Sequence, residues 1–594
     1  MSDTTQLADQ YLHDCATSPD VSNKISKGKS VSYVIDTNQG SYTTGIVTLD
    51  CSNQLTGAQG YAALKEAYVT VPYVVSLKNT GADIAGTPTL NPLMVGMKCN
   101  TATIIDKVQI EINGKTIVTP SSHLSHWNNL RAMTEWSETD VEKLGASALM
   151  YPDDTTSISF NSTAAANALQ GDGYANTHTN TAATLSTAFG GQAEKLGNTG
   201  FIKRLLNNPP PISLNGTPQS PYGWASIGAS ASQQIAAQTG KGACVGGATT
   251  GGSTMGTWYY LHRIRLVDIH PIFKELDLCA NPQLKLTLYI NTGVSNILMD
   301  YTAGGPTRSL QLESTTMTQG VTCPVMLSSA AAGSVNATFG FTTATADSSL
   351  QLAWGVMGNQ ITQSGAGAYY PYATTRMYVP FYDLHPEKAL EIVKQPVKKS
   401  RFLDYFYYPA KGQAGEGVVA GKHDANFSIQ VSGSQKNIKY VALLPYANTK
   451  SGHYAKAGVA NIDQYASPFD SAPWTCQPGS AITNFNVQVG NKWVFNAAQN
   501  YDFQGFLDEF SKLGALNGSL THELSNGLID EDKWSMAQRI LVADVSRITE
   551  KDVPTSIMIT GTNSGSQGTD FVVLVAYERE IALDRVTGEV ASFT

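Results

Sequence analysis

The strongest constraint on the fold of this chain is that one β-hairpin pattern occurs in it twice. Residues 108–117 and residues 485–494 both alternate apolar with polar side chains, and each segment turns at an Asn-Gly or a Gly-Asn pair. A lysine follows the turn at the same place in each segment, as Lys115 and Lys492. Such a pair between alternating segments indicates a tight hairpin, because Gly and Asn accept positive φ angles. The chain therefore contains two predicted hairpins of one kind.

Two further pairs of segments repeat in the same order as the hairpins. Residues 71–73 match residues 444–446, and residues 263–269 match residues 539–545. Chance similarity would explain any one match, because short β-segments all draw on Val, Ile and Thr. Three matches in one order indicate instead that a β-domain has been duplicated. The two copies differ in spacing, which predicts a large inserted loop, residues 145–256, in the first copy.

Composition supports a chain of more than one β-rich domain. Its 594 residues exceed the roughly 250–300 at which a single core stops growing. Only 14% of the residues are charged and glycine is abundant, as in turn-rich β-proteins. We expect four parts: an N-terminal arm with edge strands (1–60), a first β-domain (61–384), a basic linker (385–401) and a second β-domain (402–594).

A helix is expected after each hairpin. Apolar side chains at helical spacing predict one helix over residues 124–144, and aromatic residues on one helical face predict its counterpart over residues 503–510. Near the end of the chain, residues 571–577 form a continuous apolar run. Such a run is typical of a strand that is buried on both faces.

Charge and cysteine content argue against several classes of protein. The formal net charge is −8 and no basic arm is present to neutralise phosphates, so we expect no direct sequence-specific binding of nucleic acid. No apolar run has the length of a signal peptide or of a transmembrane segment, which predicts synthesis in the cytoplasm. The seven cysteines are odd in number and lack a CxxC spacing, which favours reduced thiols.

The inserted loop has an unusual composition. Only six of the ninety-nine residues in 157–255 carry a charge, and Ala, Gly, Thr, Ser and Asn dominate the rest. A disordered linker is one interpretation, but disorder usually comes with high charge. Scattered aromatic residues favour the other interpretation, an ordered loop that packs on itself or on neighbouring subunits.

No motif in the sequence defines a catalytic, cofactor or metal site. The Gly-Lys pairs at Lys29 and Lys115 lack the earlier glycine of a phosphate-binding loop. His123 and His126 have a spacing that two metal ligands could use, but no third ligand lies nearby, so a surface or hydrogen-bonded position is favoured. The carboxylate pair at Asp153 lies in loop-like sequence. We therefore expect no catalytic, cofactor-binding or metal-binding residues, and no enzyme.

Two segments carry a resemblance to a known family. Together with the duplicated β-domains, the helix after each hairpin and the neutral loop, residues 265–273 and 377–382 resemble double jelly-roll major capsid proteins, within them those of virophages and polinton-like viruses. The resemblance extends from about residue 60 to the end. It implies an all-β fold with short helices: a double jelly roll made of two eight-stranded antiparallel β-sandwiches in tandem.

The same resemblance implies a function in a virion. Three chains would form a pseudo-hexagonal capsomer, because two similar domains per chain give a homotrimer six similar corners. Capsomers would build the icosahedral shell of a double-stranded DNA virus. The implied partners are two further copies of the chain, neighbouring capsomers, penton proteins and minor capsid proteins, and the implied location is the capsid, after synthesis in the host cell cytoplasm.

A β-rich carbohydrate-binding or glycan-degrading protein, such as a virion fibre, is the alternative, and a cellular β-scaffold stays open as well. A glycan binder needs clustered exposed aromatic side chains, and a glycosidase also needs two carboxylates roughly 5–10 Å apart. Residues 369–372 and 405–408 offer the aromatic side chains. Burial of these rings would argue against the alternative.

Overall fold

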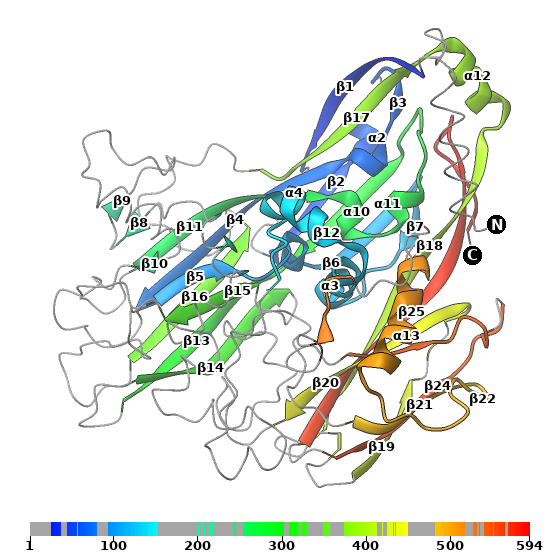
Figure 1. The fold of residues 1–594 in the computed structure, drawn as a ribbon. Helices are drawn as coiled ribbons and strands as arrows, with labels where there is room; N and C mark the ends of the chain where they lie inside the picture. Colours follow the sequence, from blue (N-terminus) through cyan, green and yellow to red (C-terminus); the bar gives the residue numbers. More distant parts are fainter. Residues whose placement is uncertain are drawn as a thin grey trace.

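The fold is known from a computed structural model of the chain. The structure describes residues 25–36, 44–55, 58–79, 93–152, 254–301, 308–319, 324–329, 348–356, 374–412, 418–419, 425–431, 433, 435–448, 482–516, 527–531, 534, 540–549, 552–564 and 568–593, with a few positions between 200 and 244. Two β-sandwiches stand side by side in this part of the chain, and short helices lie between them (Figure 1).

The first sandwich consists of two antiparallel sheets. One contains, in spatial order, β1 (Ser26–Ile35), β17 (Arg376–Leu384), β4 (Tyr68–Asn79) and β11 (Thr254–Arg265). The other contains β2 (Ile46–Asp50), β12 (Leu284–Ile290), β6 (Ile105–Ile112) and β7 (Lys115–Val118). Numbered by sequence, the eight strands form sheets of order 1-8-3-6 and 2-7-4-5, which is the connectivity of a jelly roll.

Further strands extend the first jelly roll. One edge of β4 pairs first with β17 and then, further along, with β16 (Ser348–Val356). β16 pairs in turn with β13 (Thr292–Tyr301), and β13 pairs with β14 (Arg308–Gln319). β5 (Leu93–Met97), β10 (Ala243–Cys244) and β15 (Val325–Ser329) form a separate small sheet. The other short strands are β3 (Tyr61–Ala62), β8 (Ser213–Leu214) and β9 (Thr217–Pro218).

The second sandwich repeats the connectivity of the first. One sheet contains β18 (Val397–Ala410), β25 (Gly568–Asp584), β20 (Ile438–Asn448) and β23 (Leu541–Asp544), with β26 (Val590–Phe593) paired to β25. The other contains β19 (Ala425–Val431), β24 (Ile557–Asn563), β21 (Ile482–Val489) and β22 (Lys492–Trp493). The orders are again 1-8-3-6 and 2-7-4-5. The chain is therefore a double jelly roll, and the predicted fold class is confirmed.

The repeated hairpins occupy equivalent places in the two jelly rolls. β6 and β7 meet at a turn in which Asn113 and Gly114 have φ angles of 50° and 72°, and β21 and β22 meet at Gly490, with φ of 58°. Ile110 and Val487, which align in the sequence repeat, are both fully buried. Both hairpins are thus confirmed.

The predicted helix after the first hairpin is two helices, so that prediction was wrong in its extent. α3 (Leu124–Glu135) ends before Ser137, and α4 (Glu138–Ala148) begins after it. The Ser137 side chain accepts a hydrogen bond from the Asp140 N–H, and the Asp140 carboxylate accepts one from the Ser137 N–H. This reciprocal cap starts a new helix and changes the direction of the chain. In the second jelly roll, α13 (Phe503–Leu516) is a single helix.

The third sequence match holds for strands but not for single residues. β11 ends at Arg265, and α10 (Leu266–Ile269) follows it directly, whereas Asp544 lies in β23. Asp268 instead forms an ion pair with Arg265, with 2.8 Å between Nε and Oδ2. A second short helix, α11 (Ile272–Glu275), follows α10.

Element boundaries differ from some of the expected domain ranges. β1 and β2, within the expected arm 1–60, are edge strands of the first jelly roll. The expected linker 385–401 contains α12 (Pro386–Lys394) and the start of β18, so the second jelly roll begins at Val397 rather than at 402. The expected loop 145–256 overlaps the end of α4 and the start of β11, and most of it lies outside the described residues.

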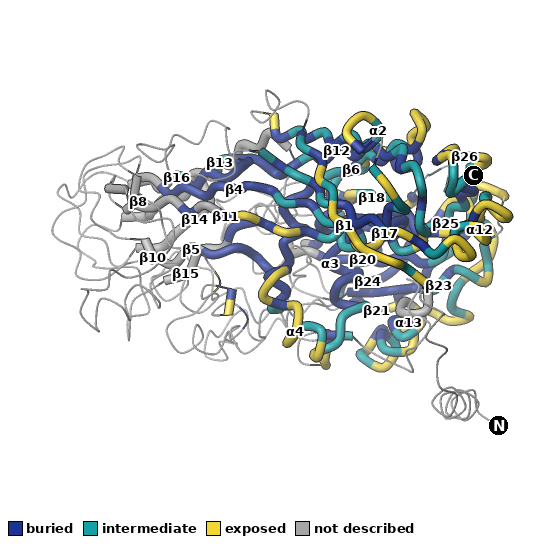
Figure 2. Tube along the Cα trace, turned by 90° about the horizontal axis from the view of Figure 1, so that it is seen from above, coloured by how far each residue is buried: buried dark blue, intermediate teal, exposed yellow. Residues whose placement is uncertain are grey.

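The apolar run 571–577 is confirmed as a buried strand. It forms the middle of β25, between β18 and β20, and residues 571–576 are all buried. Phe571 contacts Phe427 of the facing sheet, with ring centroids 4.5 Å apart. Figure 2 shows the same contrast across the molecule, with central strands buried and β1, α4 and α12 exposed along much of their length.

Candidate functional site: the junction between the two jelly rolls

The helix α3 joins the first jelly roll to the second. His123, which precedes it, has a left-handed backbone with φ of 61°, a conformation that His adopts more readily than most residues. Every residue from Leu124 to Thr134 is buried, including polar ones. A helix that is buried all round lies inside a core, and here that core is shared by two domains (Figure 1).

Trp127 is the central contact of this junction. Its indole Nε1–H donates a hydrogen bond of 3.2 Å to the Tyr440 hydroxyl in β20. Its ring stacks on Tyr405 of β18, with centroids 4.8 Å apart. Because β25 lies between β18 and β20, Trp127 covers the outer side of the second jelly roll's sheet. A large ring with a satisfied polar group gives this contact both apolar burial and a fixed orientation.

Backbone carbonyls provide further links across the junction. The Tyr405 hydroxyl donates a hydrogen bond of 2.7 Å to the Ser121 carbonyl oxygen. Lys115 donates one of 2.9 Å from Nζ to the Val590 carbonyl oxygen in β26. The repeated lysine of the first hairpin thus contacts the second jelly roll.

A buried carboxylate, Asp404, lies where the two domains meet. It accepts hydrogen bonds from the Tyr405 N–H (2.8 Å), the Tyr577 hydroxyl (3.2 Å) and Arg579 Nη1 (3.2 Å), while His270 Nε2 from the first jelly roll is 3.5 Å away. Burial alone would raise the pKa of Asp404, but these donors and the Arg579 charge outweigh it and hold the pKa below its usual value. Arg579 also donates to the Ile117 carbonyl oxygen at 2.7 Å, so one cation serves both domains.

His270 is neutral in this arrangement. Burial lowers its pKa, and its Nδ1 accepts a hydrogen bond from the Ile272 N–H at 3.2 Å. The remaining proton is therefore on Nε2, which faces Asp404. This His–Asp pair joins the first jelly roll to the second.

His123 and His126 are part of the same junction. They are buried rather than on the surface, which corrects one of the two predicted positions. Their rings meet edge to face at 5.3 Å, and His123 packs on Tyr407 of β18 at 4.0 Å. Burial lowers the pKa of His123 to about 3. Within the described part of the chain, no group of three His, Cys, Asp or Glu side chains could hold a metal ion.

The carboxylates around α3 are already paired with cations. Glu135 Oε2 lies 2.6 Å from Lys274 Nζ and Glu135 Oε1 lies 3.4 Å from Arg131 Nε. Arg131, Glu135 and Asp268 border a small pocket beside the helix. These ion pairs hold α3 against α11 within the first jelly roll.

The aromatic segment 405–408 does not form a glycan platform. Tyr405 is buried under Trp127, and residues 406–408 are half-buried in β18. The other aromatic segment, 369–372, lies outside the described residues, as do Asp153 and Asp154. Lys115 lies in a hairpin and Lys29 in a strand, so neither belongs to a phosphate-binding loop. Cys279 is buried, which raises the pKa of its thiol to about 11.

Sequence reasoning missed the residues that hold the two domains together. Asp404 and Arg579 were not singled out, although a carboxylate between Leu403 and Tyr405 in an apolar strand is a usable signal. Charged residues are rarely buried without a partner, so such a position points to a cation elsewhere in the chain. The position of that cation, in the last long strand, has no local signal.

Comparisons with known proteins agree on one type of structure. No family model and no curated protein sequence matches the chain. The chain is similar to a solved structure of the Sputnik virophage, at 10% identity over 97% of this chain and 90% of that one, with a TM-score of 0.48. It is also similar to the mavirus major capsid protein (10% identity, 97% and 93%, TM-score 0.38) and to the Faustovirus major capsid protein (8%, 95% and 92%, 0.41). Because these TM-scores are below 0.5, the fold assignment rests on the strand connectivity itself.

A membrane-crossing helix is not found in the described part of the chain, where none is both long and apolar enough to span a bilayer.

Proposed function

We propose that this chain is a major capsid protein, of which three copies form a pseudo-hexagonal capsomer in the icosahedral shell of a double-stranded DNA virus. The observation that carries the proposal is the repetition of one jelly-roll connectivity, 1-8-3-6 and 2-7-4-5, in two domains of one chain. Three such chains place six similar sandwiches in a ring.

The junction supports the same proposal. A capsomer needs its two sandwiches at a fixed angle. The buried helix α3, with Trp127 against the second jelly roll, and the buried contact between His270 and Asp404 both oppose bending between the domains. The capsomer would contact neighbouring capsomers, penton proteins and minor capsid proteins in the virion.

The chain acts, in this proposal, through its surfaces and not as an enzyme. The buried His270–Asp404 pair links the two domains, and the carboxylate of Glu135 beside α3 is paired with Lys274. The glycan-binding alternative requires exposed aromatic rings, whereas Tyr405 is buried and residues 406–408 are half-buried.

Electron microscopy of the purified chain, together with sedimentation, tests the proposal. We expect trimers with a hexagonal outline and, at high concentration, sheets or shells of them. Monomers that bind glycan columns and never form hexagonal particles would contradict it.

A further inference from the structure

Exposed apolar side chains gather around α12, the helix between the last strand of the first jelly roll and the first strand of the second (Figure 1). Leu390 and Val393 are 52% and 53% exposed, and their three-residue spacing places them on one side of the helix. Ile392, by contrast, is buried. Val397 at the start of β18 and Ile25 just before β1 are 48% and 63% exposed. We call these four exposed side chains the α12 patch.

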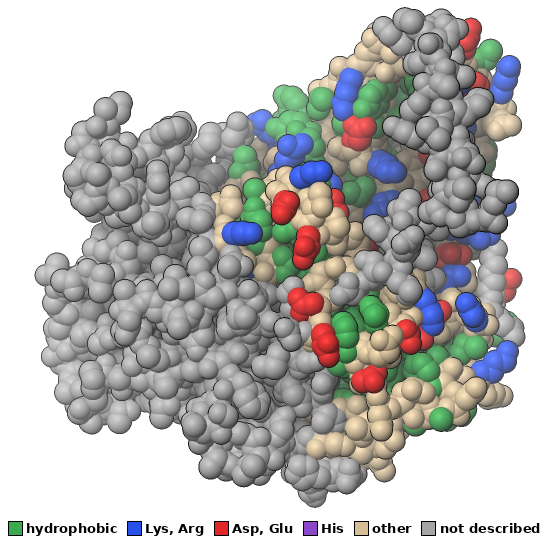
Figure 3. Space-filling model, viewed as in Figure 1, with side chains coloured by type: hydrophobic (Ala, Val, Ile, Leu, Met, Phe, Trp, Pro, Cys, Tyr) green, Lys and Arg blue, Asp and Glu red, His purple; other side chains and the backbone are tan. Residues whose placement is uncertain are grey.

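The α12 patch is accompanied by basic side chains. Residues 385–401 contain four lysines and one arginine but only two glutamates. Lys394 lies one helical turn after Leu390 and is exposed. Figure 3, in the view of Figure 1, shows hydrophobic and basic side chains at the surface at this end of the molecule. Exposed apolar groups that gather in this way usually mark a contact surface.

Charge complementarity favours an acidic partner that also has an apolar side. Acidic neighbours in the fold reach two of the lysines: Lys398 Nζ lies 2.7 Å from Asp277, and Lys399 Nζ lies 3.7 Å from Glu580. Both lysines stay half exposed or more, so these pairs screen their charge only in part.

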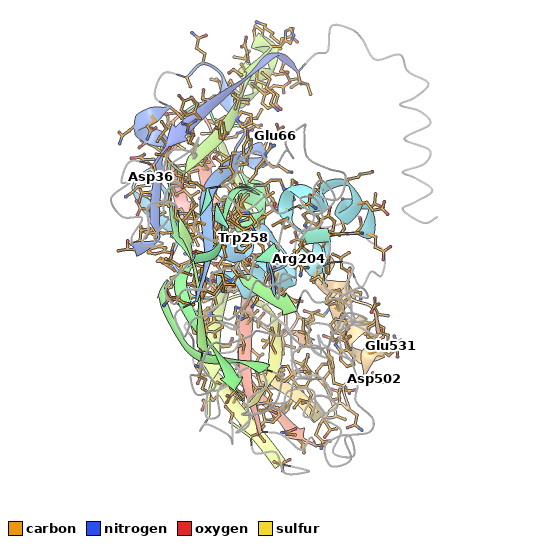
Figure 4. The ribbon with its side chains drawn as sticks, turned by 90° about the vertical axis from the view of Figure 1, so that its left-hand side faces the viewer. Asp36, Glu66, Arg204, Trp258, Asp502 and Glu531 are labelled. Carbon is orange, nitrogen blue, oxygen red and sulfur yellow. The ribbon has the colours of Figure 1, made fainter. Side chains whose placement is uncertain are left out.

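The acidic side chains near α13 do not serve the α12 patch within the chain. Asp502 and Glu531 lie on the second jelly roll, away from the end of the molecule that carries α12 (Figure 1, Figure 4). The complement to the patch therefore has to come from another segment.

Residues 1–24, which precede β1 and lie outside the described residues, have the required chemistry. We call them the N-terminal segment. They contain four aspartates and one lysine. Their apolar side chains recur at the spacing of one helical face: Leu7, Tyr11, Leu12 and Cys15. At the same spacing the aspartates fall on the other side, so the sequence predicts an amphipathic, acidic segment.

The N-terminal segment starts beside α12. The Ile25 carbonyl oxygen accepts a hydrogen bond of 3.1 Å from the N–H of His385, the N-cap residue of α12. The helix has nine residues and is about 14 Å long, so twenty-four residues are enough to turn back and cover it. A tether of this kind gives an effective concentration of about a millimolar, which favours the segment over a free partner of equal affinity.

We propose that the N-terminal segment binds the α12 patch of its own chain. Its apolar side packs on Leu390 and Val393, and its aspartates face the lysines at the end of α12 and the start of β18. The contact forms within one chain, so it does not depend on the proposed capsomer. It removes from water the apolar side chains that α12 exposes.

Hydrogen exchange of full-length variants tests the proposal from the side of the N-terminal segment. Leu12→Asp places a carboxylate on its apolar side, whereas Gln10→Asp adds the same charge to its polar side and is the matched control. We expect the amides of residues 389–394 to exchange about tenfold faster in Leu12→Asp than in the unaltered chain. Their exchange should be unchanged in Gln10→Asp.

Limited digestion with chymotrypsin tests the proposal from the side of the helix. Tyr11 is a cleavage site for this protease in the N-terminal segment. Leu390→Asp places a carboxylate in the α12 patch, opposite the acidic segment, and Val553→Asp, at an apolar position 47% exposed on the second jelly roll, is the control. We expect Leu390→Asp to release the N-terminal fragment about tenfold faster than Val553→Asp. Both positions are exposed, so the melting temperatures of the two variants should be alike.

Vesicles of anionic phospholipid distinguish the N-terminal segment from a membrane as the occupant, because basic amphipathic helices also bind membrane surfaces. The segment is overturned as the occupant if Leu390→Asp abolishes sedimentation with such vesicles while Leu12→Asp leaves the exchange of α12 unchanged. Equal exchange rates of α12 in the unaltered and Leu12→Asp chains, or equal rates of release from the two digested variants, overturn it as well.

Discussion

The two helices that follow the repeated hairpins have the same place in their jelly rolls but different surroundings. α3 is buried from Leu124 to Thr134, whereas α13 keeps Gln504 and Asp508 in solvent. The sequences of the two helices do not predict this difference, because α3 contains more polar residues than a helix that is buried all round usually has. The difference arises because α3 packs, through Trp127, against the outer side of the second jelly roll's sheet. Burial in this protein therefore reflects the position of a copy in the chain more than its own composition.

The largest expected effect is in β25, the strand that lies beneath α3. Val573→Asp would bury a carboxylate without a cation, at a cost of about 5 kcal/mol, which is comparable to the stability of a typical domain. Chemical denaturation should show the second jelly roll unfolded or nearly so. Val553→Asp, at an exposed position of the same jelly roll, is the control and should change stability by no more than about 0.5 kcal/mol.

Truncating the helix contacts compares α3 with α13 directly. Trp127→Ala removes a fully buried ring and its hydrogen bond to Tyr440, and should cost about 4 kcal/mol of unfolding free energy. Phe503→Ala removes a half-buried ring of α13 that packs on Trp534, and should cost about 2 kcal/mol. Equal losses of unfolding free energy in the two variants would show that packing contributes equally to the stability of the two helices, which contradicts this comparison.

The charge at the junction should matter more than charges on the surface. Arg579→Met leaves Asp404 buried without its cation, for an expected loss of about 3 kcal/mol. The exposed Arg401, whose Nε lies 3.3 Å from Glu580, is the comparison, and Arg401→Met should cost less than about 1 kcal/mol. Thermal unfolding of both variants measures the difference. A loss in Arg401→Met as large as that in Arg579→Met would contradict the role given to the junction.

Acid should weaken the junction through its histidines. The pKa of His123 is lowered to about 3 in the folded chain, so below its unfolded value of about 6.5 the unfolded state binds a proton that the folded state does not. Stability from this residue is complete above pH 6.5 and decreases by up to about 1.4 kcal/mol per pH unit as the pH falls toward 3.

The buried carboxyl of Asp106 acts in the opposite direction. Burial raises the pKa of Asp106 to about 6, so the folded chain binds this proton at a higher pH than the unfolded chain does. The stabilisation from this proton is lost as the pH rises from about 4 through 6.

Replacing His123 by Gln removes the histidine contribution to this acid sensitivity. Melting temperatures of His123→Gln between pH 7 and pH 4.5 should fall less steeply than those of the unaltered chain. Parallel pH profiles would show that His123 is not buried as neutral imidazole.

The smallest effect is expected on the exposed side of α13. Asp508→Ala should change the stability of the single chain by less than about 0.5 kcal/mol, because Asp508 is exposed and its carboxylate accepts a 3.1 Å hydrogen bond from the exposed Gln504 side chain. A large loss would mean that this side of α13 is already in use within the chain.

Local pattern was sufficient to predict the repeated elements. Alternation and an Asn-Gly pair located the hairpin that turns at Gly114, and the apolar run 571–577 located the central strand β25. The break between α3 and α4 was also readable, since Ser137 and Asp140 have the spacing of a capping box, but helical periodicity was followed past it.

The junction could not be predicted in the same way. Its contacts are Trp127 with Tyr440, and Asp404 with His270 and Arg579. The residues of each pair lie more than a hundred positions apart in the sequence, so a short stretch of sequence cannot reveal them. The burial of His123 and His126 follows from the same long-range contacts. Sequence reasoning therefore identified two domains of one kind but not the surface by which they are joined.

A cryo-electron microscopy map of the purified particle tests the central claim most directly, because it shows both the number of jelly rolls in the ring and the surfaces between them. The account predicts three chains and six sandwiches, with the two sandwiches of each chain joined through α3. A particle whose ring does not contain six sandwiches, or in which α3 does not lie between the two sandwiches of one chain, would contradict the account.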